Sequence, residues 1–599
     1  MRFLPEYHKA PAGLAYISLV FVGLLWILPF LYYRHAYPLT TFYQEWGAAM
    51  LGLCAMPLLV TQRFWQQPEI PRIILLPVGL MLLVLVQFML DKITYFDQTL
   101  LFTLYMLWAS LLAILGHQLR EELGLPTLAM TLAVFLLLGA ELSALAGVLQ
   151  HYRWRTFLDA VVTVKTSAAV YGNLAQPNHF ADYITLGLFS LGLLYARWRL
   201  RIWQVLLLAA PLLFVLTLSG SRSPWFYLLY MAGMSFMWQR RDKSSLPLLY
   251  YSLVLVLGFG LMNLVVQIPW MAGSSGSITA VERMVDEIGS NGAVSSGGIR
   301  LHIWHEAWLI FMQFPVWGAG FGQFAWQHFQ LGPILNNINI TGLYNNAHNL
   351  VMQVAAEMGL VGLLMLLGAL SLWFWQARNA QHSIYHWWGY GLLAVLGIHS
   401  LLEYPLWYAY FLGVAAFILG MLDNTVYRLE LRAMGRLSVA AMLLLGVLSL
   451  SQLLQSYRNL EGLMDMRAAS TTEDRRLREG LVAVQGQPML RPYAELIMSG
   501  MIEQNADHLA DKLWLNENVM RFVPIGPVVY REAVLLALAG KQAAAEVQME
   551  RAIWSYPGDF PAERGKLRDF ALKDPEHFAA LLEFAIKKNE EWQRAIHTR

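Results

Sequence analysis

One histidine and two arginines are the residues whose types and positions in the chain could do chemistry. His348 stands in "NNAHNLVMQVAAEMGL" (345–360), directly before an apolar stretch, and Arg222 and Arg300 each stand where an apolar helix is expected to begin. A neutral imidazole can take a proton from a hydroxyl group. Guanidinium groups bind phosphate oxygens through paired hydrogen bonds. Together they would suit the activation of a hydroxyl nucleophile and the binding of a pyrophosphate leaving group.

The surroundings of His348 favour a neutral ring. We expect this residue at or just inside a helix start capped by Asn345 or Asn346, where the helix dipole disfavours the imidazolium. A polar stripe with a spacing of four residues should face protein or water, not lipid. Its members are Asn345, Asn349, Gln353 and Glu357. The alternative for a lone histidine at a membrane interface is a structural role.

The two arginines are expected at anion-binding positions. In "TLSGSRSPWFYLLY" (217–230), three serines and Pro224 mark a helix start, so Arg222 would stand beside free backbone N–H groups. Arg300 would open an amphipathic, aromatic helix at 301–314 of the kind that lies in a membrane interface. The alternative for Arg222 is a capped helix whose arginine extends to lipid headgroups.

Two shorter polar stretches contain supporting candidates. "GNLAQPNHFADY" (172–183) contains Asn178, and "HSLLEYPLWYAYFL" (399–412) contains a carboxylate that should have a partner, followed by aromatic residues typical of a membrane interface. These residues are Glu403, Tyr404 and Trp407.

A nucleotide loop, a metal site and a cofactor are not expected. "GAGFGQF" (318–324) follows no strand, so its glycines more plausibly let the chain turn tightly after Pro315. His302 and His305 have no obvious third ligand, and no Asp-rich motif is present.

Composition places this chain among polytopic membrane proteins of the all-α class. Of its 599 residues, 57% are hydrophobic and 14% are charged. Apolar runs long enough to cross a bilayer recur about thirteen times. We expect spans at 13–32, 43–61, 73–90, 98–116, 126–149, 179–195, 202–218, 223–239, 248–268, 348–375, 386–402, 405–422 and 437–455.

Basic residues in short loops predict the orientation. The segments 197–201, 239–243 and 427–436 fall on the side of the N-terminus, which the positive-inside rule makes cytoplasmic. The loop at 269–347 and everything after 455 would then lie on the outer face. The net charge of +2 gives no reason to expect a nucleic-acid partner.

We predict two domains. Residues 1–455 would form the membrane domain, including the outer loop 269–347 with its amphipathic helix. Residues 456–599 are more charged and carry helical patterns, one with a Gly turn between two amphipathic helices, as in tetratricopeptide repeats. A soluble α-helical domain on the outer face is therefore expected there.

Several of these motifs, taken together, resemble a known superfamily. "NAHNLVMQVAAEMGL" is similar to the histidine signature of the O-antigen ligases and polymerases, and "GNLAQPNHFADY", "GSRSPW", "IRLHIWHEAW" and "PVWGAGFGQF" resemble its other landmarks. "LLEYPLWYAYFL" and the helical tail narrow the resemblance to the bacterial protein O-oligosaccharyltransferases of the PglL type. The resemblance runs from about residue 170 to the end.

The resemblance implies a metal-independent glycosyltransferase of the GT-C type in the bacterial inner membrane, with its active site and C-terminal domain facing the periplasm. Such an enzyme moves a glycan en bloc from undecaprenyl pyrophosphate to Ser or Thr hydroxyls of a periplasmic protein such as a pilin. The essential histidine of the family would be His348, and the arginines that contact pyrophosphate would be Arg222 and Arg300.

Other functions stay open at this point. A ligase that transfers to lipid A core and a polymerase that extends the glycan share most of these motifs, whereas the large outer tail and "QPNHFADY" favour a protein acceptor. A transporter would need polar residues across the whole membrane, and here they gather mainly at one face.

Overall fold

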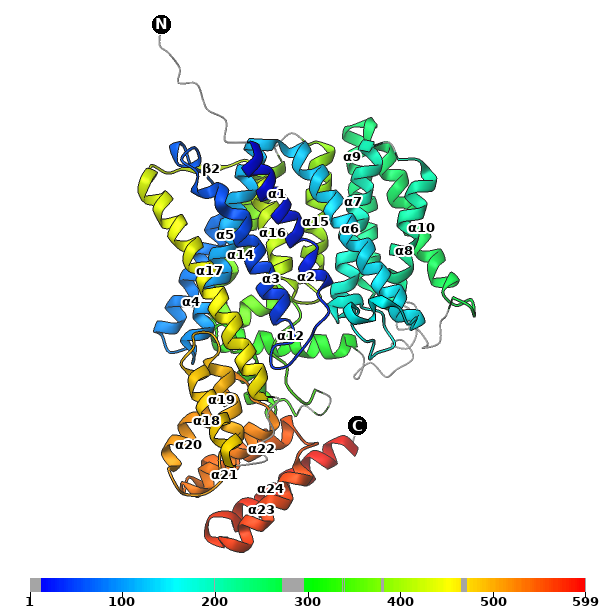
Figure 1. The fold of residues 1–599 in the computed structure, drawn as a ribbon. Helices are drawn as coiled ribbons and strands as arrows, with labels where there is room; N and C mark the ends of the chain where they lie inside the picture. Colours follow the sequence, from blue (N-terminus) through cyan, green and yellow to red (C-terminus); the bar gives the residue numbers. More distant parts are fainter. Residues whose placement is uncertain are drawn as a thin grey trace. The chain divides into compact units, whose positions relative to one another are not determined.

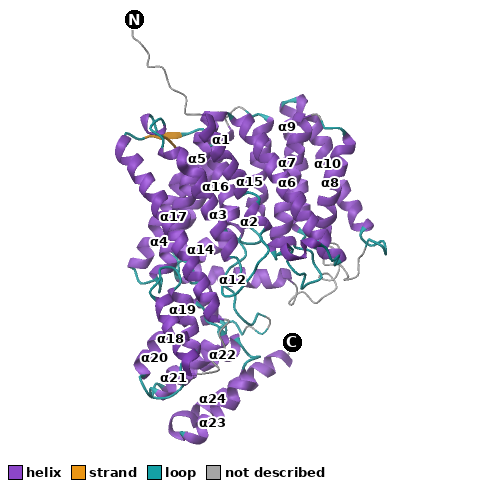
Figure 2. Cartoon of the chain, in the orientation of Figure 1, coloured by secondary structure: helices purple, strands orange, loops and turns teal. Residues whose placement is uncertain are grey.

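The computed structural model describes residues 12–198, 200–271, 296–336, 338, 340–378, 382–464 and 471–597 (Figure 1). Within these residues the chain is mostly helical, as expected, and the two short strands visible in Figure 2 pair as an antiparallel sheet. Arg199 in a basic loop and the 272–295 part of the outer loop lie outside the described residues.

The chain divides into two compact units. The first comprises Met1–Gly79, Tyr105–Gly289 and Leu366–Ser451, and the second comprises Leu80–Leu104, Ser290–Met365 and Gln452–Arg599. Four helices continue from one unit into the other: α4 (Leu75–Met89), α5 (Phe96–Leu123), α14 (Leu350–Arg378) and α17 (Arg432–Met464).

The remaining elements each lie within one unit. The first unit contains α1 (Ala12–Leu25), α2 (Leu28–Leu31), α3 (Phe42–Ala55), η1 (Met56–Val60), η2 (Phe64–Gln66), β1 (Glu69–Pro71), η3 (Arg72–Ile74), α6 (Leu125–Tyr152), η4 (Phe157–Val161), η5 (Gly172–Leu174), α7 (Pro177–Trp198), α8 (Ile202–Leu218), α9 (Ser223–Arg241), η6 (Lys243–Ser245), α10 (Leu246–Val265), α15 (Ile384–Ser400), η7 (Pro405–Trp407), α16 (Ala409–Leu422) and β2 (Val426–Arg428). The second contains α12 (Ser296–Gln313), α13 (Phe324–Leu331), α18 (Thr471–Gln485), α19 (Arg491–Gly500), α20 (Leu509–Phe522), α21 (Gly526–Leu538), α22 (Gln542–Ser555), α23 (Phe560–Lys573) and α24 (Pro575–His597).

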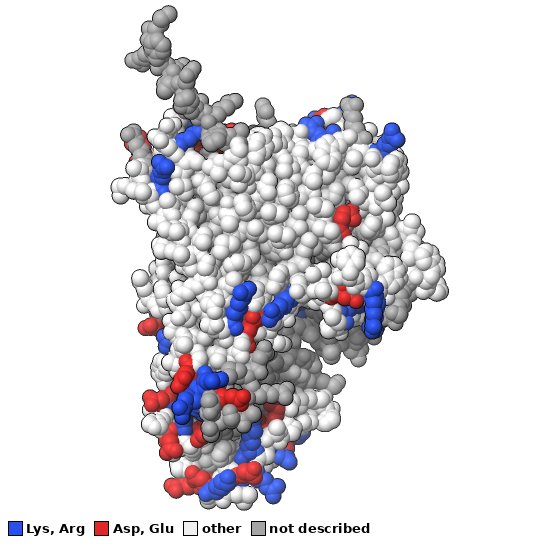
Figure 3. Space-filling model, in the orientation of Figure 1, with Lys and Arg blue, Asp and Glu red and all other residues white. Residues whose placement is uncertain are grey.

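Seven helical segments of the described chain are long and apolar enough to cross a membrane. They are Gly13–Leu31, Arg72–Met89, Phe96–Leu123, Leu125–Tyr152, Lys243–Val265, Leu350–Arg378 and Ala433–Met464. On the face seen in Figure 3, charged side chains are sparse over the long apolar helices and dense over α18 to α24. The other expected spans also fall on helices, but these are shorter or less apolar, so the count of about thirteen stays a prediction.

Aromatic rings join the helices of the first unit. Phe30 stacks on Tyr183 with ring centroids 4.1 Å apart, and Trp26 meets Phe417 edge to face at 5.7 Å. Between apolar helices in lipid, close packing of this kind takes the place of the hydrophobic effect as the main attraction. It therefore connects α2 with α7, and α16 with the turn that follows α1.

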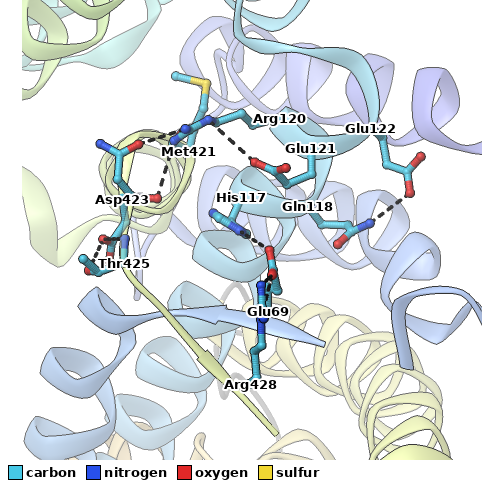
Figure 4. A network of polar contacts seen from close by, with 11 residues as sticks. Glu69, His117, Gln118, Arg120, Glu121, Glu122, Met421, Asp423, Thr425 and Arg428 are labelled. Carbon is cyan, nitrogen blue, oxygen red and sulfur yellow. Dashed lines mark hydrogen bonds and ion pairs between the residues drawn. The ribbon is translucent and has the colours of Figure 1, made fainter. Parts of the chain in front are cut away.

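A polar network ties the last turn of α5 to the end of α16 and to the small sheet (Figure 4). Arg120 donates to the carbonyl oxygen of Met421 at 3.1 Å, and His117 lies 3.7 Å from a Glu69 carboxylate oxygen. Glu69 also pairs with Arg428 at 2.9 Å, across the two strands. These contacts connect α5, the end of α16 and both strands, next to the basic segment 427–436.

The C-terminal helices pack as neighbouring pairs in the second unit. α21 and α22 are joined by a turn in which Gly540 has a φ of 68°, so the expected Gly turn between two helices is confirmed. Val529, Ala533 and Ala552 are buried between these helices and their neighbours. α17 continues to Met464, and the predicted boundary at 455/456 stays a prediction.

Candidate active site

His348 lies two residues before α14, in a left-handed backbone conformation with a φ of 50°. The helix is capped by the following residue: Asn349 Oδ1 accepts the backbone N–H of Val351 at 3.0 Å and of Met352 at 3.2 Å. The cap expected at Asn345 or Asn346 is therefore wrong. Because His348 precedes the cap, it stands outside the helix and its position is set by the loop.

The His348 loop, residues 345–349 directly before α14, is held by hydrogen bonds to its backbone. Gln353 Oε1 accepts the N–H of Ala347 at 2.6 Å, and Trp304 Nε1 of α12 donates to the carbonyl oxygen of Ala347 at 3.0 Å. Asn346 Oδ1 accepts the N–H of His348 at 2.8 Å. The sequence pattern did not indicate Trp304, because an aromatic residue in an amphipathic segment is more simply explained by packing.

The predicted polar stripe is present for three of its four members. Asn345 is exposed and precedes the helix, whereas Asn349 caps it and Gln353 and Glu357 continue along it as buried residues. Glu357 Oε1 accepts the backbone N–H of Phe324, the first residue of α13, at 3.0 Å. The inner part of the stripe therefore binds protein, as expected for polar groups in an apolar helix.

A break in α14 explains the run of glycines. Gly359 has a φ of 64° and a ψ of −161°, which interrupts the helix, and a Cβ there would collide with the carbonyl oxygen of Val316. Residues 315–320 bond to both sides of the break: Gly320 N–H donates to the carbonyl oxygen of Glu357 at 3.0 Å, and Leu360 N–H donates to that of Pro315 at 2.8 Å. The backbone groups that the break leaves unpaired are thus satisfied within the protein.

The expected tight turn after Pro315 is confirmed. Gly318, Gly320 and Gly322 all have positive φ, of 72°, 116° and 74°, which side chains other than glycine rarely adopt. Gln87 of α4 also binds the backbone next to the break in α14: its side-chain amide donates to the carbonyl oxygen of Glu357 at 2.7 Å. Gln87 was not among the predicted site residues, although a lone amide within an apolar span is a signal visible in the sequence.

Arg300 lies one turn inside α12, because this helix begins at Ser296, five residues before the expected start at 301. It is partly buried, as is His348. One face of α12 is buried through Ile303, Ala307 and Ile310, in a small core shared with α13, Ala347 and the start of α14. Its opposite face exposes apolar side chains, namely Leu301, Trp308 and Met312.

In the first unit, the structure brings Asn178, Ser221 and Glu403 together. Asn178 Nδ2 donates to Glu403 Oε1 at 2.8 Å, and Ser221 Oγ donates to Asn178 Oδ1 at 2.8 Å. The prediction that Glu403 has a partner is thereby confirmed, and the partner is Asn178. This chain of hydrogen bonds links the first turn of α7, the residue preceding Arg222, and the turn after α15.

Arg222 is the N-cap residue of α9, and Pro224 occupies the first turn, as expected. No serine side chain caps this helix: Ser219 Oγ donates to the carbonyl oxygen of Leu216 at 2.7 Å, and Ser221 donates to Asn178. The helix therefore begins without a serine cap, and the alternative that Arg222 extends to lipid headgroups stays open.

Aromatic and histidine residues flank Glu403 in the chain and contact one another. Tyr404 stacks on Tyr408 with centroids 5.9 Å apart, and Trp407 ends the short η7 helix between them. His399, one turn before Glu403, lies with Nδ1 3.0 Å from the hydroxyl oxygen of Tyr227. Tyr227 was not among the predicted site residues, because a tyrosine in an apolar span resembles an ordinary core residue.

The predicted site residues thus form two groups in different units. Arg300, His348, Asn349, Gln353 and Glu357 belong to the second unit, and hydrogen bonds and a shared core connect their elements. The others belong to the first unit: Asn178, Arg222, Glu403, Tyr404 and Trp407.

Three family models match successive parts of the chain. Residues 170–195 match "Protein glycosylation ligase", residues 207–367 match "O-Antigen ligase", and residues 387–566 match "Virulence factor membrane-bound polymerase, C-terminal". The first match contains Asn178, and the second contains Arg222, Arg300 and His348.

A curated relative is similar over most of its length. The general O-oligosaccharyltransferase of Acinetobacter baylyi is 26% identical over 469 residues, which cover 76% of this chain and 76% of the relative. The resemblance inferred from the sequence motifs is confirmed by these matches. With the seven apolar helices, they identify an integral membrane protein similar to enzymes of the glycosyltransferase type.

Proposed function

Because the chain resembles the O-antigen ligases and a general O-oligosaccharyltransferase, we propose that it transfers a glycan en bloc to hydroxyl groups of proteins. The donor is an undecaprenyl-pyrophosphate-linked oligosaccharide, and the acceptors are Ser or Thr side chains of periplasmic proteins such as a pilin. The enzyme lies in the inner membrane of a bacterium, with its active site and C-terminal helices on the periplasmic side. It uses no metal ion and no cofactor.

In this mechanism, His348 accepts the proton of the acceptor hydroxyl as its oxygen attacks the anomeric carbon. The bond from that carbon to the pyrophosphate oxygen breaks, and undecaprenyl pyrophosphate leaves with the bonding electrons. Arg222 and Arg300 neutralise its charge, so the leaving group needs no protonation. Attack from the face opposite the leaving group inverts the anomeric centre, which NMR of the product linkage tests.

The similarity to the Acinetobacter baylyi O-oligosaccharyltransferase is the observation that carries the proposal. The local structure around His348 supports it, because a base must be held in place to act on a hydroxyl group. Three hydrogen bonds hold the backbone of Ala347 and His348. Trp304 donates to the carbonyl oxygen of Ala347, the N–H of Ala347 donates to Gln353, and the N–H of His348 donates to Asn346.

Transfer from undecaprenyl-pyrophosphate-linked glycan to a purified pilin, in detergent, tests the proposal. Wild type is compared with His348→Ala and with His305→Ala, the second being an exposed histidine on α12 that serves as a matched control. We expect transfer that survives EDTA, persists in the control and is lost in His348→Ala. Full activity of folded His348→Ala would refute the role of the histidine, and loss of activity in EDTA would refute metal independence.

The second candidate is an O-antigen ligase or polymerase. The match of residues 207–367 to "O-Antigen ligase" and of 387–566 to a membrane-bound polymerase favours it. Parallel assays with lipid A core and with a second lipid-linked glycan as acceptors separate the candidates. Transfer to either of these, with none to protein, would replace the proposed acceptor.

A further inference from the structure

A buried carboxylate on α12 has no part in the chemistry proposed above. Glu306 is completely buried, and its Oε2 lies 2.8 Å from Nδ1 of His328 on α13. Its Oε1 lies 3.3 Å from Nε2 of His302, one turn earlier on α12. A buried charge of this kind is costly unless it is paired, so Glu306 depends on its histidine partners.

The histidine contacts keep Glu306 ionised. Burial acts to raise its pKa, but the hydrogen bonds and charges of His302 and His328 outweigh it, and the pKa of Glu306 lies below its usual value. His328 is itself buried, with 4% of its surface exposed. The Glu306–His328 contact is therefore a charge-assisted hydrogen bond, which is stronger than a neutral one.

His328 also contacts the residue that directly precedes the His348 loop. Its ring meets Tyr344 edge to face, with centroids 5.3 Å apart. Tyr344 precedes the His348 loop by one residue, and burial together with the negative charge of Glu306 raises its pKa. At the other end of the loop, Trp304 of α12 donates to Ala347. The loop is thus held from α13 at its start and from α12 at its end.

We propose that Glu306 is a positioning residue for His348, which locks α13 against α12 and thereby fixes both ends of the loop that presents the catalytic histidine. The inference rests on the proposed function. Packing alone is a weaker explanation, because an apolar side chain would fill the same buried position without the cost of burying a charge.

The test uses Glu306→Gln, His328→Phe and the double variant in the full-length protein. Glu495→Gln is the matched control, because Glu495 is also completely buried in the second unit and bonds to Tyr95 at 2.6 Å. We expect each single variant to lower kcat about tenfold or more while KM for the lipid-linked donor changes little, since misplacing a catalytic group affects mainly the chemical step. The double variant should be no slower than the slower single variant, because both changes remove one interaction.

Hydrogen exchange supplies a measurement that does not depend on activity. In Glu306→Gln, the backbone amides of 344–349 should exchange faster than in wild type, whereas those of 362–370 in α14 should not. His328→Gln, whose side-chain amide can still donate to Glu306, should recover part of the activity lost in His328→Phe.

Unchanged kcat and unchanged exchange in Glu306→Gln would overturn the inference, as would multiplicative losses in the double variant or an equal loss in Glu495→Gln. Wild-type protein that transfers no glycan to any acceptor would instead refute the proposed function. The exchange measurement would then still decide whether Glu306 orders the loop.

Discussion

The side-chain oxygen of Gln353 accepts the backbone N–H of Ala347 at 2.6 Å, so the first turn of α14 holds the residue directly before His348. We predict that Gln353→Leu, which keeps the size of the side chain but removes the acceptor, lowers kcat about tenfold by leaving a buried N–H unpaired and the loop less ordered. Rates of glycan transfer measure this effect. Gln452→Leu removes an exposed side-chain hydrogen bond from α17 to Gln487 and should leave the rate unchanged. An equal loss in both variants would contradict the prediction.

Arg300 and Arg222 should each act on the pyrophosphate. Arg300→Lys and Arg222→Lys keep the charge but remove the forked guanidinium, so we expect kcat/KM for the donor to fall roughly tenfold to hundredfold. The comparison is with Arg428→Gln, where the arginine is exposed and paired with Glu69 across the small sheet. If either lysine variant retains the wild-type kcat/KM, that arginine does not bind the leaving group.

Gly359→Ala should destabilise the protein. Its backbone has a φ of 64°, and an added Cβ would collide with the carbonyl oxygen of Val316, so we expect a loss of about 1 to 3 kcal/mol. Gly368→Ala in the same helix is the control, because nothing lies within 4 Å of the added Cβ and alanine favours a helix. Thermal unfolding in detergent measures both. A Gly359→Ala variant as stable as Gly368→Ala would argue against the break in α14.

The stability of α21 should fall as the pH rises from about 5 to 8. Burial, reinforced by Glu517, raises the pKa of Glu532 to about 7 in the folded chain, whereas an unfolded glutamate has a value of about 4.3. A raised pKa stabilises the fold below the unfolded value, and this contribution is lost as the pH rises through the folded value, by about 4 kcal/mol at most.

Glu532→Gln removes this titration. Protection of α21 amides from hydrogen exchange, compared between wild type and variant at each pH, should therefore diverge in favour of the variant as the pH rises from about 5 to 7. A constant difference across the range would show that Glu532 does not titrate there.

Much of the helical architecture could be predicted, because apolar runs of bilayer length are a local property of the chain. The runs at 126–149 and 248–268 fall on α6 and α10, and Pro224 falls in the first turn of α9 as expected. The need for a partner of Glu403 could be predicted in the same way, because a carboxylate next to apolar spans must be paired with another polar group.

The cap of α14 could not be predicted, because three asparagines near its start, Asn345, Asn346 and Asn349, are all good caps by type. Asn349 is selected by the fold: Trp304 and Gln353 bind Ala347, and the chain can become helical only after His348. The break at Gly359 escaped prediction for a similar reason, since a glycine in an apolar run gives no sign that another segment will bond to the exposed backbone.

The sequence by itself determined that this is a helical membrane protein. It also determined which histidine and arginines were candidates for glycan transfer, because residue type, span length and motif order are properties of the sequence alone. Only the tertiary structure decided that Asn349 caps α14, that Asn178 pairs with Glu403, and that Glu306 pairs with His328. The last two pairings join segments that are distant in the sequence, and the cap at Asn349 depends on the contacts that Trp304 makes with Ala347. All three therefore depend on packing rather than on local pattern.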